Sequence, residues 1–315
     1  MGVWADSWAR YCRPLSRLTG SEWADKFRVV PPGTSPEPGP WRTSRTPYLK
    51  EPMDAATDRD TEFVVLEFSS QLGKSEMLLG VIGYFADQEP APQLMLQPTV
   101  EMAEAFSKER IEPMFQHSPG LKGKLEEGKD GRGSAKKSST TIRMKHYPGG
   151  YLALVGANSP AGLASRPIRV LLCDEVDRYG ATKEGDPLKL AIQRTQNFAN
   201  RKIVLVSTPT IKGVSKIDEY FEKSDRRYFY VKCPYCGHEH RLEWANVRWD
   251  KGEDGLGDPM TAAMYCPLCG AKERGPYKPN PDMLAGGRWI AENPEATTRG
   301  YHCNALYSPW VNLHD

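Results

Sequence analysis

The sequence predicts an α/β fold: a mainly parallel sheet flanked by helices, with a small zinc-ribbon-like insertion. Short apolar runs alternate with helix-like patterns from Phe63 to about Tyr230. This alternation is typical of parallel strands joined by crossover helices that cover both faces of the sheet. Two cysteine pairs between residues 231 and 287 break the alternation and predict the insertion. A chain of 315 residues has room for one large domain and one small one.

Residues 1–62 precede the first predicted strand and form a separate N-terminal segment. Aromatic and basic residues come first and allow a short amphipathic helix, and a Pro/Gly-rich run from Pro31 to Pro40 predicts an extended strap. Tyr48 follows, shortly before the strand. Its ring is placed either to stack on an adenine base or to serve as a packing residue.

The apolar run from Phe63 to Leu66 predicts a buried strand that leads into Gly-Lys-Ser and then into an apolar helix. This is the layout of a phosphate-binding loop, in which backbone N–H groups cradle the phosphates, Lys74 reaches their oxygens and Ser75 binds Mg²⁺. The full pattern has glycine where this chain has Phe68, so a chance turn stays open as an alternative. The expected loop contacts are Ser69, Ser70, Gln71, Gly73, Lys74 and Ser75.

A second apolar run begins at Ile168 and ends in the carboxylates Asp174 and Glu175, about 100 residues after the loop. In ATPases with a phosphate loop, the first acid of such a pair holds Mg²⁺ and the second polarises the attacking water. An isolated Asp-Glu pair would more simply be a solvated turn. Its position downstream of the Gly-Lys-Ser turn favours the catalytic interpretation.

A third apolar run starts at Lys202 and ends in Ser207 and Thr208. Ligands bind at the carboxyl ends of parallel strands, so hydroxyl groups there suit a sensor of the γ-phosphate. Taken alone, these residues would be only a turn. As the third strand of the series, they predict a P-loop NTPase of the type with an additional strand and a catalytic glutamate (ASCE), with ATP as the nucleotide.

Four of the seven cysteines form two Cys-Pro-x-Cys-Gly pairs, Cys233 with Cys236 and Cys266 with Cys269. In a reducing compartment such cysteines favour a metal over disulfides. The tight turn of each pair aims two thiolates at one ion. Four thiolates spaced in this way favour tetrahedral Zn²⁺ in a closed structural site.

The net charge of +2 is too small to indicate nucleic-acid binding by itself. Basic residues gather between Leu121 and His146 among glycines, serines and threonines, which predicts an exposed loop that is either solvated or a contact for a phosphate backbone. No apolar run approaches the roughly 20 residues needed to cross a bilayer. The N-terminus also lacks the layout of a signal peptide. We therefore expect a cytosolic protein.

With these landmarks placed, the chain resembles the large terminase subunit of tailed bacteriophages, specifically the lambda-like GpA family. The resemblance covers nearly the whole length and is more specific than a general ATPase signature. It rests on Gly39 to Tyr48, Ser69 to Glu76, Gly156 to Pro160, Asp174 to Arg178, Ser207 to Thr210 and the two cysteine pairs. Proteins of this family use ATP hydrolysis to move double-stranded DNA into a procapsid.

The resemblance implies a role for each residue that matches a family motif. Lys74 and Ser75 become the phosphate and Mg²⁺ contacts, Asp174 the metal-binding acid, Glu175 the catalytic base, Ser207 and Thr208 the coupling motif, and Tyr48 the adenine contact. An arginine is also expected, because the charge that develops on the γ-phosphate needs a cation. Many terminases carry it inside the loop, where this chain has Ser70. Arg166, acting on a neighbouring subunit's ATP, is the better candidate, with a structural salt bridge as the alternative.

The resemblance further implies double-stranded DNA, a small terminase subunit and the portal protein as partners. It also implies a homo-oligomeric ring, no membrane, and the host cell cytoplasm as the location. On this interpretation residues 63–230 are the ATPase core and residues 231–287 the zinc-binding segment. Residues 288–315 are expected to start a linker toward a nuclease domain downstream, so no cleavage activity is expected of this chain.

Two other classes of protein remain possible at this point. The first is a fragment of a superfamily-2-like DNA translocase or helicase, which shares the loop, the Asp-Glu strand and a Ser/Thr motif but needs a second recombinase-like domain. The second is a zinc-ribbon nucleic-acid-binding assembly module with a degenerate nucleotide site. Phe68 favours that module, whereas the joint presence of Lys74, Ser75, Asp174 and Glu175 speaks against it.

Overall fold

The computed structural model describes residues 17–35, 37–125, 140–159, 166–252, 255–275 and 279–314. Among these residues, ten strands form one central sheet in the order β10-β9-β15-β3-β8-β7-β4-β6-β5, and β14 also pairs with β9. The strands are β3 (Phe63–Phe68), β4 (Pro92–Gln97), β5 (Met144–Tyr147), β6 (Gly150–Gly156), β7 (Val170–Asp174), β8 (Lys202–Ser207), β9 (Arg227–Lys232), β10 (Glu239–Arg241), β14 (Arg288–Ala291) and β15 (Arg299–Cys303).

The middle of this sheet is parallel, which confirms the predicted fold class. β15, β3, β8, β7, β4 and β6 run in one direction, and β9 runs parallel to β15. β5, β10 and β14 are antiparallel to their partners. Because the carboxyl ends of parallel strands meet at one edge of a sheet, the segments that follow β3, β7 and β8 are neighbours.

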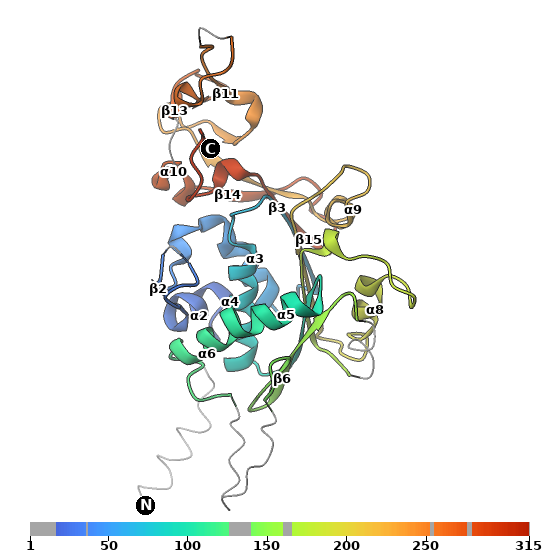
Figure 1. Cartoon of the computed structure of the whole chain (residues 1–315). Helices are drawn as coiled ribbons and strands as arrows, with labels where there is room; N and C mark the ends of the chain where they lie inside the picture. Colours follow the sequence, from blue (N-terminus) through green and yellow to red (C-terminus); the bar gives the residue numbers. More distant parts are fainter. Residues whose placement is uncertain are drawn as a thin grey trace, which may run out of the picture.

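Helices cover both faces of the sheet (Figure 1). One face carries α2 (Gly20–Phe27), α3 (Lys50–Thr57), α4 (Lys74–Asp87), α5 (Val100–Phe106) and α6 (Glu112–His117), and the other carries α8 (Pro187–Gln193) and α9 (Lys216–Glu222). Short 3₁₀ helices span Thr43–Arg45, Pro47–Leu49, Val176–Arg178, Trp244–Asn246, Pro259–Thr261 and Ala305–Tyr307. In the described part of the chain, no helix combines the length and apolar character that crossing a membrane would need.

The side chains of β3 show how one strand serves two cores. Val64, Leu66 and Phe68 belong to the core under α2, α3 and α4, whereas Val65 belongs to the core on the opposite face. This division follows from the alternation of side chains along a strand. α4 is buried along almost its whole length, because α2, α3 and β6 pack against it. Its burial anchors the turn that precedes it.

The described part of the expected linker, residues 288–314, belongs to the fold. β15 lies inside the sheet between β9 and β3, and its five residues pair with Val64 to Phe68. β14 pairs with β9. The sequence of β15, Arg-Gly-Tyr-His-Cys, has no apolar run to predict a strand. Its burial is supplied by the strands on either side, so the pattern of residues alone could not reveal it.

The cysteine-bearing segment is a small unit that projects beyond one end of the large sheet (Figure 1). β11 (Val247–Arg248), β12 (Ala263–Tyr265) and β13 (Lys272–Arg274) form its three-stranded antiparallel sheet. α10 (Pro281–Ala285) lies between this unit and the main body. We call the segment from residue 231 to residue 275 the cysteine module.

The N-terminal segment is partly helical and partly extended. α2 begins with a capping box formed by Thr19 and Glu22 and packs against α3 and α4. β1 (Val29–Val30) directly precedes the Pro/Gly-rich run and pairs with β2 (Gly39–Pro40) at the end of that run. The aromatic and basic residues before position 17, and the centre of the basic stretch at residues 126–139, lie outside the described residues.

Gly83 is the residue at which α4 meets α2, and its substitution tests this packing. A Cβ atom at Gly83 would lie 2.1 Å from the ring of Trp23, which is completely buried. We expect Gly83→Ala to lower the stability by a net ~1–3 kcal/mol, because overpacking outweighs the gain in helix propensity. Thermal unfolding measures the loss. Gly180→Ala is the control, since nothing lies within 4 Å of a Cβ there, and equal effects of both changes would contradict the packing argument.

Candidate active site and metal centre

The loop between β3 and α4 has the backbone shape of a phosphate-binding loop. Gln71 and Gly73 adopt left-handed conformations, with φ of 59° and 80°. Gly73 is required there, since an added Cβ would also come within 3.0 Å of Leu49. Phe68 stands in place of the first glycine of the pattern. Its side chain is buried in the core, and its ring stacks on that of Trp289 with 6.1 Å between the ring centroids. This departure from the pattern is therefore a core contact beneath the loop.

The Lys74 amine lies at the centre of the loop. It donates to the carbonyls of Phe68 and Ser69 at 3.0 and 2.8 Å, and to the Thr208 hydroxyl at 2.8 Å. Burial lowers the pKa of Lys74, and the carboxylates Glu175 and Asp174 partly oppose that shift. Two residues that the sequence predicted for one site, 134 positions apart, are thus in direct contact.

Ser75 and Asp174 form the second contact of the site. The Ser75 hydroxyl donates to Asp174 Oδ2 at 3.0 Å, and the Gln97 amide lies 3.4 Å from the same oxygen. Asp174 Oδ1 is buried and has no hydrogen-bond partner among the described residues. Burial raises the pKa of Asp174, and the hydrogen bond from Ser75 opposes this rise. An orphan carboxylate oxygen beside a hydroxyl group is the kind of oxygen donor set that Mg²⁺ prefers.

Glu175 follows directly and has a left-handed backbone, with φ of 55°. Its side chain lines a cavity of about 420 Å³ together with the phosphate loop. Arg178 lies 3.4 Å from its carboxylate. A non-glycine residue in this conformation is strained, and such residues cluster at functional sites. In this conformation the Glu175 side chain lines the cavity, where its carboxylate could activate a water molecule.

Ser207 and Thr208 are joined to the acidic strand through Asp177. The Asp177 backbone donates to the Ser207 hydroxyl at 3.3 Å, and the Asp177 carboxylate accepts from Thr210 and from the Ile217 backbone at 2.9–3.0 Å. The ends of β7 and β8 and the start of α9 therefore form one hydrogen-bonded unit. Through Thr208 this unit reaches Lys74.

Two predicted site residues lie away from this cavity. Tyr48 has no exposed surface, since its ring packs edge-on against those of Phe68 and Phe229. The distances between ring centroids are 6.1 and 6.2 Å. It is a packing residue in this structure and could stack on adenine only if the core opened. Arg166 is exposed near Met144. It precedes β7, whereas Asp174 ends that strand, so Arg166 could serve only the site of another subunit.

The cavity also contains residues that the sequence patterns missed. Arg110 and Trp310 line it beside the loop. Arg110 belongs to a π-helical turn, Ser107–Ile111, between α5 and α6, and it pairs with Glu76, which also pairs with the buried Arg28. No pattern of spacing marks these positions, because their approach to the loop depends on how distant segments pack. Only the π-helical turn, a frequent feature of functional sites, singles out Arg110.

The four cysteines of the two pairs come together in the cysteine module. Their sulfur atoms all lie within 4.8 Å of one another, with Cys233–Cys269 at 3.9 Å and Cys236–Cys266 at 3.8 Å. Thiolates bound ~2.3 Å from a tetrahedral zinc ion would lie ~3.8 Å apart. The spacing therefore suits one tetrahedral ion, and it is far longer than the bond of ~2.05 Å in a disulfide.

The two pairs have the same backbone geometry. Gly237 and Gly270 are left-handed, with φ of 73° and 69°, and each donates its N–H to the carbonyl of the first cysteine of its pair. The glycine closes a tight turn that points both sulfur atoms inward. Next to this cluster, His240 lies 3.0 Å from the buried Glu273, which adds a second polar pair to the interior of the module.

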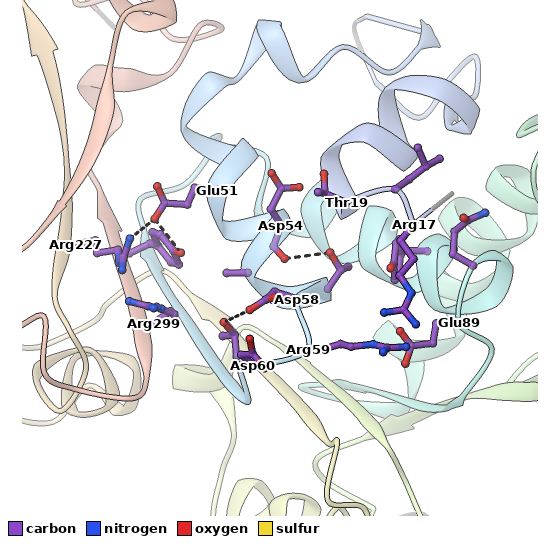
Figure 2. Close-up of a pocket in the computed structure, with 17 residues that line it drawn as sticks. Arg17, Thr19, Glu51, Asp54, Asp58, Arg59, Asp60, Glu89, Arg227 and Arg299 are labelled. Atoms are coloured by element: carbon purple, nitrogen blue, oxygen red, sulfur yellow. Dashed lines mark hydrogen bonds and ion pairs between the residues drawn. The ribbon is translucent and has the colours of Figure 1, made fainter. Parts of the chain in front are cut away.

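A larger cavity of about 900 Å³ lies at the opposite edge of the sheet (Figure 2). Arg227 and Arg299, which begin β9 and β15, line it together with Glu51 and Asp54. Two of its acids are already engaged: Glu51 pairs with Arg227, and Asp54 accepts from the Ser21 backbone at 2.8 Å. None of the described residues predicted for a site lies there. Size alone therefore does not identify the functional cavity.

A parallel sheet, a left-handed turn into α4, a buried lysine and two adjoining acids at the carboxyl edge define a nucleotide-binding protein with a phosphate loop. Comparison with known proteins then identifies the family. The chain belongs to the family described as phage terminase large subunit gpA, ATPase domain, which matches residues 35–289.

Two terminase large subunits are similar to the chain in sequence. That of Enterobacteria phage P21 is 29% identical over 293 residues, covering 90% of this chain and 43% of the relative. That of Escherichia phage lambda is 27% identical over 256 residues, covering 80% of this chain and 38% of the relative. The chain thus spans less than half the length of these relatives.

Among solved structures, the HK97 bacteriophage large terminase is similar to the chain in fold. The match covers 65% of this chain and 41% of the HK97 chain, with 13% identity and a TM-score of 0.51.

As long as no cation neutralises it, the buried charge of Asp174 is expected to lower the free energy of unfolding. Its pKa is raised from 3.8, so the cost is absent below that pH, grows as pH rises toward the raised pKa and is complete above it. We expect Asp174→Asn to raise stability by about 1–2 kcal/mol without ligands. Thermal unfolding should show a larger gain at pH 8 than at pH 4. The exposed Asp60→Asn is the control, and a lower melting temperature for Asp174→Asn would refute the argument.

Proposed function

We propose that this chain is the Mg²⁺-dependent ATP-hydrolysing motor domain of a phage terminase large subunit, which moves double-stranded DNA into a procapsid. The observation that supports this most is the convergence of Lys74, Ser75, Asp174, Glu175 and Thr208 at one edge of the sheet. The family to which the chain belongs is described by its ATPase domain. The translocation of DNA is inferred from the resemblance to terminases.

Binding of ATP would place its phosphates in the loop between Phe68 and Lys74. The Lys74 amine would exchange the carbonyls of Phe68 and Ser69 for phosphate oxygens, and the N–H groups at the start of α4 would face them. Ser75 and Asp174 would hold Mg²⁺, which supplies neutralising charge to the phosphates. A nucleotide-bound cation would also satisfy the orphan Asp174 oxygen. The site therefore fits both groups.

Hydrolysis requires a base and a compensating cation. Glu175 would orient and polarise the attacking water, because its carboxylate faces the same cavity as Lys74. Arg110 lines that cavity and could supply a positive charge within the subunit. Arg166 is exposed at the other edge of the sheet. We therefore propose that it supplies a positive charge to the ATP of a neighbouring subunit in a ring.

Coupling of hydrolysis to movement would begin at Thr208. Its hydroxyl accepts from Lys74, and Ser207 beside it is bonded to Asp177. When Lys74 turns toward a nucleotide, Thr208 loses this donor and becomes available to the γ-phosphate. We propose that this exchange transmits the state of the nucleotide to α9, whose first turn is tied to Asp177.

The assembled machine would contain several partners. From the resemblance we propose double-stranded DNA, a small terminase subunit, the portal protein and further copies of this chain in a ring. We also propose that the cysteine cluster holds Zn²⁺ as a closed structural site, since four thiols leave no open position.

The motor assignment predicts ATP turnover that long double-stranded DNA stimulates. Glu175→Gln should reduce kcat by roughly 10²–10⁴-fold, because a general base is lost, and change nucleotide affinity only a few-fold. Steady-state hydrolysis and nucleotide titration measure the two effects. Glu184→Gln is the control, since Glu184 is exposed and lies outside the cavity. Unimpaired turnover in Glu175→Gln would contradict the assignment of Glu175 as the catalytic base. Wild-type protein that binds no ATP would favour the assembly-module alternative.

Metal analysis tests the zinc site directly. We expect one zinc ion per chain, and its loss in Cys236→Ser, because three thiols close the tetrahedron poorly. Chelation should change the fluorescence of Trp244 and Trp249, which are half-exposed in the module at 55% and 54%. Cys303→Ala is the control, since Cys303 is buried in the main sheet and should not affect metal content. Wild-type protein purified without any bound metal, and unable to take up zinc, would contradict the proposal.

A further inference from the structure

Residues 304–311, which we call the C-terminal strap, follow β15 and run beside the phosphate loop. The Ser69 backbone donates to the Cys303 carbonyl at 3.0 Å, where β15 ends. The Ser308 hydroxyl then donates to the Gln71 carbonyl at 2.8 Å. Ser308 has no exposed surface, so water does not compete for this bond. The loop is therefore attached to the end of β15 at Ser69 and to the strap at Gln71.

The contact from Ser308 controls the direction of a loop peptide. Gln71 has a left-handed backbone, which a side chain rarely adopts without support from its surroundings. The C=O and N–H groups of a trans peptide point in opposite directions. Holding the Gln71 carbonyl against Ser308 therefore sets the direction of the next N–H, that of Leu72. On the proposed function, that N–H would be one of the loop donors to a phosphate.

Trp310 gives the strap a second contact with the loop. Its ring lies 3.9 Å from the position that a Cβ on Gly73 would occupy, and it lines the cavity that contains Lys74 and Glu175. The Trp310 backbone donates to the Ser308 hydroxyl at 3.3 Å. The Ser308 hydroxyl thus contacts both the Gln71 carbonyl and the Trp310 backbone N–H.

Arg274, on β13 of the cysteine module, braces the strap from its other side. Its guanidinium donates to the Leu306 carbonyl at 2.8 Å and to the Val311 carbonyl at 2.9 Å. These two carbonyls lie on either side of Ser308 in the chain. Arg274 is only 4% exposed, and burial lowers its pKa to about 10, so it remains charged at neutral pH. Hydrogen bonds from a charged donor are the stronger kind.

The position of Arg274 depends in turn on the cysteine cluster. The Cys266–Cys269 pair forms the turn between β12 and β13, and the Cys266 backbone donates to the Ala271 carbonyl at 2.9 Å. The module also reaches the strap at Leu242, whose carbonyl accepts from Asn304 at 2.7 Å. A metal ion that closes this turn would therefore hold β13, and with it Arg274, in place.

We propose that Arg274 and Ser308 are positioning residues for the phosphate loop, and that they couple metal binding in the cysteine module to nucleotide binding. This inference rests on the proposed function, because it requires the loop to bind a nucleotide. The coupling is reciprocal: if zinc raises the affinity for ATP by some factor, ATP raises the affinity for zinc by the same factor. The cysteine module thus acts on the motor site as well as stabilising its own fold.

The test measures the dissociation constant of a fluorescent ATP analogue with Mg²⁺ for the whole chain. We expect Ser308→Ala to weaken binding about fivefold to tenfold, as for one buried hydrogen bond. Arg274→Ala should weaken it by at least as much, and Arg274→Lys by less, since an amine can bridge the two carbonyls only in part. Arg248→Ala is the control, because Arg248 is an exposed arginine of the same module that stacks on Tyr265. Melting curves and zinc content confirm that each variant is folded and loaded.

A second measurement separates coupling from simple structural damage. Zinc affinity, followed with a chelating dye, should rise in the wild type when the ATP analogue is added, and this rise should shrink in Ser308→Ala. Unchanged nucleotide affinity in folded Ser308→Ala and Arg274→Lys would overturn the inference and leave the proposed function intact. An equal zinc affinity with and without nucleotide in the wild type would also overturn it. Failure of the wild type to bind any nucleotide would overturn the proposed function, and the coupling with it.

Discussion

The parallel pairing of β3 with β8, and of β8 with β7, is the constraint on which the rest of the site depends. The register of these strands brings the residues after Phe68, Asp174 and Ser207 to the same edge. Contacts across 99 and 134 positions of sequence, from Ser75 to Asp174 and from Lys74 to Thr208, follow from that register. A slip by one residue would turn every side chain to the opposite face. The chemistry of the loop is thus inseparable from the order of the sheet.

The same site concentrates features that a stable protein would otherwise avoid. Lys74 and Asp174 are buried charges, and Gln71 and Glu175 have left-handed backbones. Each is unfavourable for folding, and each faces the position where a highly charged ligand would lie. The two large cores around α4 and α9 supply the stability that offsets these costs. We therefore expect the free-energy balance of this site to improve if phosphates and a cation bind there.

The cysteine module is connected to this site by more than chain continuity. β13 braces the strap through Arg274, and the strap holds the loop through Ser308. Such a connection would make a metal ion in the cysteine cluster relevant to a distant nucleotide site, because both would bias the position of one short segment. It also explains why β15 and the strap belong with the ATPase core, although they follow the cysteine module in sequence.

The sequence by itself determined the fold class, the phosphate loop, the acidic strand, the hydroxyl groups at the end of β8 and the cysteine pairs. These features are local: an apolar run, a Gly-Lys-Ser turn or a Cys-x-x-Cys spacing can be recognised without knowing what packs against it. Tertiary structure decided the burial of Tyr48, the place of β15 inside the sheet, and the approach of Arg110, Arg274 and Trp310. Their environment is supplied by residues far away in the chain, and no period or spacing records which distant segment will cover a given side chain.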